Sequence, residues 1–388
     1  MEVITVKNNE LFNKMIEWRH HLHMHPETAF EEKETADYLV AILEELGLEV
    51  HRNIGGTGIV ANLKCGNSDK AIGLRSDIDA INLTETGNPD YKSKNNGKMH
   101  ACGHDGHMAT LLGAAKLLSE DKSFDGTVRF IFQPAEEPGK GALAMINDGL
   151  FEKFPVDEIY GFHNRPNSPA GMILTRSGGI MASEDNFTIK IKGVGSHASS
   201  PHLGVDPLVI GAEIILALQT IISRIMNPTI PAVISCTEIH TDGAHNALPS
   251  NVVITGDTRS TSPETQEILE KRMRQIVKNI CEAYNAEYEF EYTHEFGPTI
   301  NWEDCTQSLI EVAQKVVGEK NVDGSCEPWM GSEDFGYYLN EVPGCLFFIG
   351  SGKENSVPLH NSQYDYNDEV LELGATIYKE LILSRLTK

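Results

Sequence analysis

The sequence predicts an α/β fold, a mostly parallel sheet with helices on both faces, into which a ferredoxin-like α+β domain is inserted. Strand-like and helical stretches alternate through the first part of the chain, which is typical of a parallel sheet. Between residues 185 and 296 the expected order becomes strand, helix, strand, strand, helix, strand, which is the ferredoxin-like order. At 388 residues the chain is also too long for one ordinary core. We therefore expect a discontinuous large domain, residues 1–184 and 297–388, and a smaller domain, residues 185–296.

Hydrophobic patterning places the elements of the large domain. Residues 31–46 put apolar side chains on one helical face, and Gly47 follows as the expected helix stop. A second amphipathic helix is expected over residues 108–118. The strands of the sheet are expected at residues 71–75, 127–132, 158–162 and 346–350.

The smaller domain begins with an alternation of apolar and polar residues. This pattern at residues 187–192 is typical of a strand with one exposed face. Pro207 then opens a helix rich in isoleucine and leucine. Two strands, a second helix and a last strand are expected at residues 232–240, 251–259, 263–284 and 287–292.

The composition favours a cytoplasmic protein with neither a nucleic-acid nor a membrane partner. Lys and Arg number 32 against 56 Asp and Glu, a formal net charge of -24, and no basic stripe for phosphates is visible. Seven scattered cysteines do not form the pattern of a secreted disulfide framework. The N-terminus lacks a signal-peptide pattern, and we expect no apolar run to approach the ~20 residues that span a bilayer.

Polar side chains follow three of the predicted strands at the same end. The carboxyl ends of parallel strands form the edge at which open α/β sheets bind ligands, so these side chains should converge. Carboxylates that orient a metal-binding imidazole are common, and we assign Asp77 and Asp79 to that supporting role. The converging residues are Asp77, Asp79, Glu136, Glu137 and His163.

A metal-binding pattern lies between these strands. Cys102 and His104 supply a thiolate and an imidazole on a glycine-flanked turn, where both can reach one ion. His107 lies one helical turn further on, and we favour a supporting or packing role for it. Of the adjacent Glu136 and Glu137, one can bind metal while the other stays free as the proton shuttle that a metal-assisted hydrolase needs.

Other histidines are ambiguous by themselves. His163 and His360 would each be unremarkable among the 15 histidines of the chain. A run near the N-terminus looks metal-like but lacks a suitably placed carboxylate. We interpret this run, His20, His21, His23 and His25, as structural.

The smaller domain offers three candidates for contact with substrate. His197 lies on a glycine-flanked turn that would present it outward, although a plain loop histidine is the alternative. Asn246 precedes a predicted strand and Arg259 ends it. An amide with a guanidinium is a good receptor for a carboxylate, but the spacing alone leaves this role open.

Together these motifs resemble the amidohydrolase branch of the aminoacylase/carboxypeptidase metallopeptidase family. That branch includes hippurate hydrolases, N-acyl-amino-acid amidohydrolases, N-acetyldiaminopimelate deacetylases and auxin–amino acid conjugate hydrolases. The resemblance covers nearly the whole chain. Its motifs are Arg19-His20-His21-Leu22-His23-Met24-His25-Pro26-Glu27, Arg75-Ser76-Asp77-Ile78-Asp79-Ala80, those around Cys102 and Glu136, Gly195-Ser196-His197-Ala198, Ser332-Glu333-Asp334-Phe335 and Leu359-His360-Asn361.

The resemblance implies a zinc-exopeptidase-like fold that holds two divalent metal ions per subunit. Zinc and manganese are the ions expected first, and cobalt and nickel are the alternatives. It implies Glu136 as the general base and His197 as the oxyanion stabiliser, which in many relatives reaches the active site of a dimer partner. Asn246 and Arg259 would hold the carboxylate of the substrate. The implied metal ligands are Cys102, His104, Glu137, His163 and His360.

The resemblance also implies a reaction, the hydrolysis of N-acyl amino acids (acetyl-, benzoyl- or similar) to a carboxylic acid and a free amino acid. The expected partners are this small molecule and a second copy of the chain, in a homodimer or higher homo-oligomer formed through the smaller domain, which would also act as a lid. A dipeptidase or carboxypeptidase, or an N-acetyldiaminopimelate deacetylase, is the alternative on the same scaffold. A non-catalytic metal-binding protein is a remote alternative, since it would not need Glu136 beside Glu137.

Overall fold

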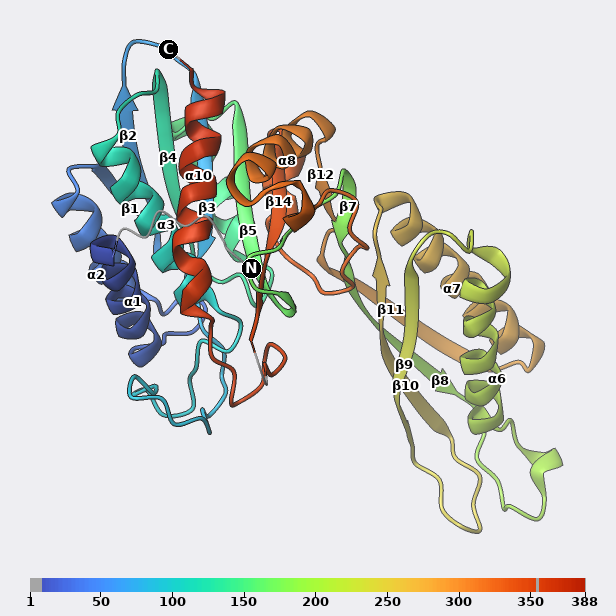
Figure 1. Ribbon diagram of the computed structural model, residues 1–388. Helices are drawn as coiled ribbons and strands as arrows, with labels where there is room; N and C mark the ends of the chain where they lie inside the picture. Colours follow the sequence, from blue (N-terminus) through green and yellow to red (C-terminus); the bar gives the residue numbers. More distant parts are fainter. Residues whose placement is uncertain (1–8, 354–355, 388) are drawn as a thin grey trace. The chain divides into compact units, whose positions relative to one another are not determined.

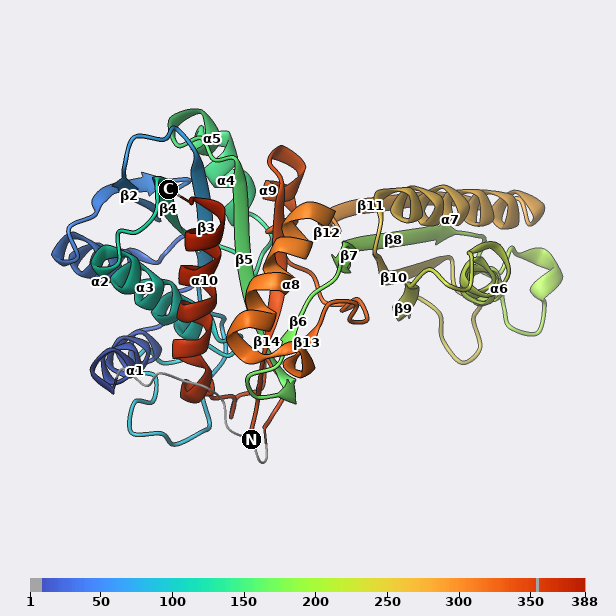
Figure 2. The same ribbon diagram turned by 45° about the horizontal axis from the view of Figure 1, so that its top comes forward.

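The computed structural model describes residues 9–353 and 356–387, which form two compact units (Figures 1 and 2). The large unit comprises Met1–Ile180, Ile300–Glu327 and Asp334–Lys388. The small unit comprises Met181–Thr299 and Pro328–Glu333.

An eight-stranded sheet forms the centre of the large unit. Its strand order is β1-β2-β4-β3-β5-β14-β6-β13, and the four central strands β4, β3, β5 and β14 run parallel to one another. Every residue of β3 is buried, as expected for a strand covered on both faces. The strands are β1 (Glu49–Ile54), β2 (Gly58–Cys65), β3 (Ala71–Asp77), β4 (Gly126–Gln133), β5 (Glu158–Pro169), β6 (Ile173–Leu174), β13 (Val322–Asp323) and β14 (Gly344–Gly352).

Helices cover this sheet on both faces, which confirms the predicted fold class. Helices α3, α8 and α10 pack beside one another on one face, and α4, α5 and α9 lie on the other (Figure 2). The helices are α1 (Asn9–Met24), α2 (Lys33–Glu45), α3 (His104–Glu120), α4 (Gly141–Asn147), α5 (Leu150–Lys153), α8 (Glu303–Val317), α9 (Gly336–Glu341) and α10 (Leu371–Arg385). Two short strands, β7 (Gly178–Met181) and β12 (Thr299–Asn301), pair with each other.

Strand β5 is longer than the sequence suggested. It continues past residue 162 to Pro169, so His163 lies inside the strand and not after its end. His163 is paired with Phe348 of β14. Beyond His163, Asn164 is buried within the strand, and its side-chain amide donates a hydrogen bond to the Tyr364 hydroxyl at 2.7 Å.

The small unit has the predicted ferredoxin-like arrangement. Its sheet order is β11-β8-β10-β9 and all of its pairs are antiparallel. Two helices contribute buried side chains such as Ile214 and Met273 to a separate core. The elements in chain order are β8 (Glu184–Lys192), α6 (Pro207–Thr220), β9 (Ala232–Thr241), β10 (Asn251–Ser260), α7 (Pro263–Ala283) and β11 (Glu287–Phe296).

Both helices of the small unit begin as their sequences suggest. Pro207 is the first residue of α6, and the side chain of Asp206 before it accepts a hydrogen bond from the Leu208 N–H. Pro263 is the first residue of α7, and the Ser262 hydroxyl accepts from the Thr265 N–H. Each helix thus starts with a side-chain cap followed by proline, the preferred order at a helix N-terminus.

Helix α6 corrects one expectation about apolar segments. With the π-helical turn that follows it, Pro207–Ile225 is 19 residues long and has a mean hydropathy of 1.8, enough by length and composition to cross a membrane. Only 28% of this stretch is buried. Ile210, Ile214 and Leu218 are buried in the core of the small unit, whereas Leu216 is 72% exposed. Both faces of α6 are therefore apolar, and only one of them packs against the core of the small unit.

Candidate functional site

Five side chains from four segments of the large unit form two groups of potential metal donors. In the first group, Cys102, His104 and His163 place their donor atoms within 4.8 Å of one another. In the second group, Cys102, Glu137 and His360 do the same. Cys102 Sγ lies 3.3 Å from His163 Nε2, and His360 Nε2 lies 3.3 Å from Glu137 Oε2. The sulfur of Cys102 therefore belongs to both groups, an arrangement suited to two neighbouring ions.

The turn between Cys102 and His104 requires its glycine. Gly103 has φ +96°, a left-handed conformation that other residues rarely adopt. A Cβ at this position would also lie 2.6 Å from the side-chain oxygen of Asn164. The chain turns sharply here and enters α3 at His104, which brings the thiol and the imidazole to the same side of the turn.

Hydrogen bonds orient the histidine rings of the first group. His104 Nδ1 donates to the Asp79 carbonyl at 2.8 Å, and His163 Nδ1 donates to the Asn164 carbonyl at 2.8 Å. These bonds fix the tautomer that leaves Nε2 of each ring available for a metal ion.

Two buried atoms of the groups lack a hydrogen-bond partner, as metal donors would in the absence of an ion. They are His104 Nε2 and Glu137 Oε1. Buried polar atoms are ordinarily satisfied, so each such atom calls for an explanation. One sulfur, three imidazoles and a carboxylate are a donor set that suits zinc and similar divalent ions.

Glu136 lies beside these donors on a constrained turn. Its Oε2 is 3.7 Å from His104 Nε2, and the residue is 6% exposed. The preceding Ala135 has φ +49°, unusual for a residue with a side chain. Its N–H donates to Glu32 Oε1 at 3.0 Å, and the hydroxyl of Thr57 donates to the other oxygen of Glu32 at 2.5 Å. Glu32 thus holds the turn that presents Glu136, a contact that the sequence analysis missed.

Asp77 and Asp79 contact residues next to the donor atoms, and their expected role in orienting a metal-binding imidazole stays a prediction. Asp79 Oδ2 accepts a hydrogen bond from the Glu137 N–H at 3.1 Å. Asp77 Oδ1 lies 2.7 Å from His107 Nδ1, and His107 Nε2 lies 2.7 Å from the Asn164 side-chain oxygen. Both ring nitrogens of His107 therefore make hydrogen bonds, and its supporting or packing role stays a prediction.

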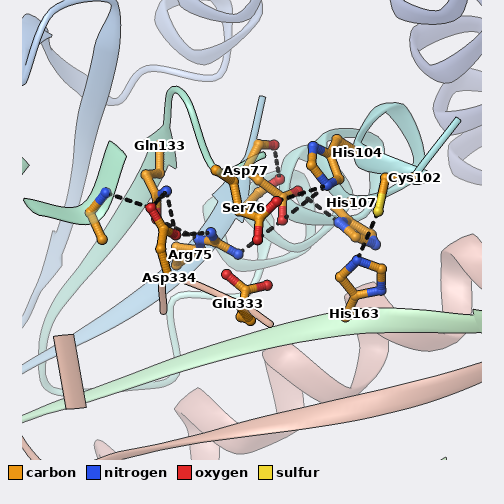
Figure 3. A network of polar contacts seen from close by, with 12 residues as sticks. Arg75, Ser76, Asp77, Cys102, His104, His107, Gln133, His163, Glu333 and Asp334 are labelled. Carbon is orange, nitrogen blue, oxygen red and sulfur yellow. Dashed lines mark hydrogen bonds and ion pairs between the residues drawn. The ribbon is translucent and has the colours of Figure 1, made fainter. Parts of the chain in front are cut away.

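A buried charge network lies on the side of Asp77 away from His104 and His107 (Figure 3). Arg75 donates to Asp77 Oδ2 at 2.9 Å, to Gln133 Oε1 at 2.9 Å and to Asp334 Oδ1 at 3.1 Å. Gln133 in turn donates to Asp334 Oδ1 at 2.7 Å, so the network ties the ends of β3 and β4 to the segment before α9. No role for Gln133 or Asp334 was predicted from the sequence. The available signal was an arginine inside an otherwise apolar buried strand, because a buried guanidinium needs several acceptors.

Burial and neighbouring charges set the protonation of the donors. Burial raises the pKa of the Cys102 thiol and lowers that of His163 well below its usual value. Burial alone would lower the pKa of His104, but the Asp77 carboxylate and the Cys102 sulfur raise it well above the usual value. Hydrogen bonds to Cys102 and Glu137 raise the pKa of His360 to about 10. In the absence of metal, the raised pKa values of Cys102, His104 and His360 therefore favour their protonated forms.

The small unit brings together two of its three candidate residues. His197 pairs with Ala247 in a short antiparallel bridge, and the Ala198 N–H donates to the Asn246 carbonyl at 3.0 Å. The Ser199 N–H donates to His197 Nδ1 at 3.1 Å, so a neutral His197 carries its proton on Nε2.

Arg259 lies at the opposite end of β10 from Asn246. Asn251, the first residue of β10, is separated from Arg259 by eight residues, roughly 27 Å at about 3.4 Å per residue. The Arg259 guanidinium pairs with Glu184 at 2.8 Å and with Asp257 at 2.9 Å. Within one chain, Asn246 and Arg259 therefore do not meet around one carboxylate.

Comparison with known proteins identifies relatives along the whole chain. The model of peptidase family M20/M25/M40 matches residues 73–384. The hippurate hydrolase of Campylobacter jejuni is 41% identical over 368 residues, 95% of each chain. Thermostable carboxypeptidase 2 of Saccharolobus solfataricus is 35% identical and 96% of each chain is covered. The crystal structure of the Bacillus subtilis YXEP protein, described as a dinuclear metal binding peptidase of the M20 family, superposes with a TM-score of 0.86 at 31% identity, covering 98% of this chain and 99% of that one.

Replacing the shared sulfur should reduce metal binding more than replacing any other buried thiol. We expect Cys102→Ala to lower the affinity for zinc by at least the ~10–100-fold that loss of an outer contact to a metal ligand costs. Cys305→Ala is the matched control, because Cys305 is also buried but lies on α8. Elemental analysis after dialysis against a zinc buffer measures both variants, and an unchanged zinc content in Cys102→Ala would contradict the assignment.

Metal uptake should release protons, because a metal replaces the protons that Cys102, His104 and His360 hold. The apparent affinity for zinc should therefore rise between pH 6.5 and pH 8. Calorimetric titration in two buffers of different ionisation enthalpy counts the released protons. Equal affinity at both pH values, with no proton release, would show that these groups are not the ligands.

Proposed function

This chain belongs to peptidase family M20/M25/M40, and on that premise we propose that it hydrolyses N-acyl amino acids to a carboxylic acid and a free amino acid. The chain is a metal-dependent amidohydrolase of this family. The observation that carries the proposal is the pair of donor groups that share Cys102, with Glu136 beside them. The 41% identity to a hippurate hydrolase over nearly the full length supports an acylated amino acid as the substrate.

In this proposal two divalent ions bind to the donor groups. Cys102 would contribute to both ions, His104 and His163 to one, and Glu137 and His360 to the other. When bound, such ions polarise the carbonyl of the scissile amide and lower the pKa of a water molecule towards ~7. The sulfur favours zinc, while manganese, cobalt or nickel could also be held.

Glu136 would act as the general base and then as the general acid. Its carboxylate accepts a proton from the attacking water and passes it to the leaving nitrogen, which departs as the amine of the amino acid. The turn at Ala135, held by Glu32, keeps this carboxylate close to the donor groups. His197 Nε2 carries a proton and would donate a hydrogen bond to the developing oxyanion.

The separation of His197 and Asn246 from Arg259 supports an active site built from two copies of the chain. One copy would supply His197 and Asn246, and the other would supply Arg259 to hold the substrate carboxylate. The small unit would be both lid and dimerisation domain. A homodimer thereby gives each site its full set of residues.

The exposed edge of the small unit is suited to such a dimer. Strand β9 ends the sheet order β11-β8-β10-β9, so within the described residues one side of its backbone has no partner strand. Val233 and Ile239 on β9 are 36% and 42% exposed, and Leu216 and Val209 on α6 are 72% and 55% exposed. The other edge, β11, carries Glu287, Glu289 and Glu291, the kind of charges that discourage pairing. We therefore propose a second copy of the chain as the occupant of the β9 and α6 surface.

The location in the cell follows from the thiols in this proposal. All seven cysteines lie in the described part of the chain and are free. Free thiols persist in a reducing compartment, so we propose a cytoplasmic protein.

A substrate panel tests the proposed function directly. The panel contains hippurate, N-acetyl, N-benzoyl and indoleacetyl amino acids, N-acetyldiaminopimelate and unblocked dipeptides, each with added zinc or manganese. Faster hydrolysis of blocked amino acids supports the proposal. Faster hydrolysis of dipeptides would support the peptidase alternative, as the carboxypeptidase relative allows, and no hydrolysis of any member would indicate a non-catalytic metal-binding protein.

Removing the base should separate chemistry from metal binding. We expect Glu136→Gln to retain its metal content and to lose about 10²–10⁴-fold in kcat, because an amide cannot accept the proton. Glu341→Gln, on α9, is the matched control and should keep full activity. A Glu136→Gln variant with its metal and nearly full kcat would contradict the base assignment.

Mixing two inactive variants should restore activity if the site is shared between copies. His197→Ala and Arg259→Ala should each be nearly inactive. In a mixed dimer, one of the two sites retains both residues, so co-expression should give about one quarter of the wild-type activity after random pairing. No recovery in a mixture shown by mass to contain mixed dimers would place both residues in the site of one chain.

A further inference from the structure

A buried charged cluster connects α1 to two other segments of the large unit. The Arg19 side chain is fully buried. Its Nη1 lies 3.2 Å from Asp105 Oδ2 and 3.1 Å from Asp365 Oδ1, and its Nη2 donates to Asp368 Oδ2 at 3.3 Å. The guanidinium also lies over the Tyr91 ring, 4.6 Å from its centroid. One cation is therefore shared by three carboxylates from two distant parts of the chain.

Two histidines of the N-terminal run extend this Arg19 cluster. His23 Nδ1 lies 2.8 Å from Asp105 Oδ2, and His23 Nε2 lies 3.5 Å from Glu85 Oε1. Burial would lower the pKa of His23, but these contacts with Asp105 and Glu85 raise it to about 9. His20 Nε2 lies 3.0 Å from Asp368 Oδ2. The histidine run thus helps to hold the carboxylates that Arg19 contacts.

The two segments joined by Arg19 are those that carry candidate metal donors. Asp105 directly follows His104, the first residue of α3. Asp365 and Asp368 come shortly after His360, whose side chain is 55% exposed and whose φ is +60°. His360 lies in a loop, outside any helix or strand, so no regular backbone hydrogen-bond ladder fixes its position.

We propose that Arg19 is a positioning residue, which fixes the segment bearing His360 against the start of α3 and so sets the affinity for the ion held by Cys102, Glu137 and His360. This inference rests on the metal ligands proposed above. Arg19 touches neither the donor atoms nor the substrate in this account. It acts through Asp105 on one side and through Asp365 and Asp368 on the other.

The donor groups differ in how much they depend on this connection. His104 and His163 lie on α3 and β5, and each ring is oriented by a backbone carbonyl. His360 instead lies in a loop, where its N–H donates a hydrogen bond to the Ala101 carbonyl at 2.9 Å. Loss of the Arg19 cluster should therefore lower the affinity for the ion at His360 and leave the affinity for the ion at His104 and His163 nearly unchanged.

Zinc binding to the purified full-length protein tests this inference. The variant is Arg19→Met, which removes the charge while keeping much of the side-chain length. Titration with zinc against a competing chelator should show one equivalent bound as tightly as in the wild type. The second equivalent should bind about 10–100-fold more weakly, which is the usual effect of losing a residue that contacts and orients a metal ligand. Arg19→Lys should recover part of the second affinity, since lysine keeps the charge but not the planar fork.

A control and a milder variant separate positioning from general stability. Arg385→Met removes an arginine that pairs with Glu158 at the first residue of β5, away from the donor groups, and it should bind both zinc equivalents normally. If Arg19→Met does not fold, Asp368→Asn takes its place, because that carboxylate is 23% exposed and contacts Arg19 on the His360 side only.

The outcomes distinguish failure of this inference from failure of the proposed function. Wild-type affinity for both zinc equivalents in Arg19→Met and Asp368→Asn, with only a lower Tm, would overturn the positioning role. If Cys102→Ala also binds two equivalents normally, the proposed ligands are wrong and the inference falls with them. Loss of binding in Cys102→Ala together with normal binding in Arg19→Met overturns the inference alone.

Discussion

The sulfur of Cys102 is the point on which the candidate site depends, because it belongs to both groups of donor atoms. Its position follows from the left-handed Gly103, which turns the chain into α3 directly after the thiol. A single buried sulfur that lies among both sets of imidazole and carboxylate donors could contribute to two ions in one site. Hydrogen bonds from Nδ1 of His104 and of His163 to backbone carbonyls then leave Nε2 of each ring free on the side of Cys102.

A layer of buried charges supports this arrangement from behind. Arg75 joins Asp77, Gln133 and Asp334, and thereby ties together the strand ends that carry the site. Such buried ion pairs add little net stability, because desolvation offsets their attraction, but removing one partner leaves an unpaired buried charge. Their value here is positional, since each contact restricts where a neighbouring donor can lie.

The fold and the region of the site could be predicted from the sequence, whereas the contacts that support the site could not. Patterning predicted β3 and β4 to within two residues of their ends, so the convergence of Asp77 and Glu136 at one sheet edge followed from parallel strands. Helix α3, in contrast, begins at His104, four residues before the predicted start. It placed the end of β5 too early, because burial of Asn164 is a tertiary effect. Glu32 was missed because nothing local shows that a glutamate before α2 bonds to a turn far along the chain. The roles of the site residues themselves remain predictions.

The most direct measurement is anomalous diffraction from crystals grown with zinc, recorded on both sides of the zinc absorption edge. The account predicts two peaks about 3.5–4 Å apart with Cys102 Sγ between them, one peak next to His104 and His163 and the other next to Glu137 and His360. No peak at Cys102, or zinc bound with these five side chains turned away, would contradict it.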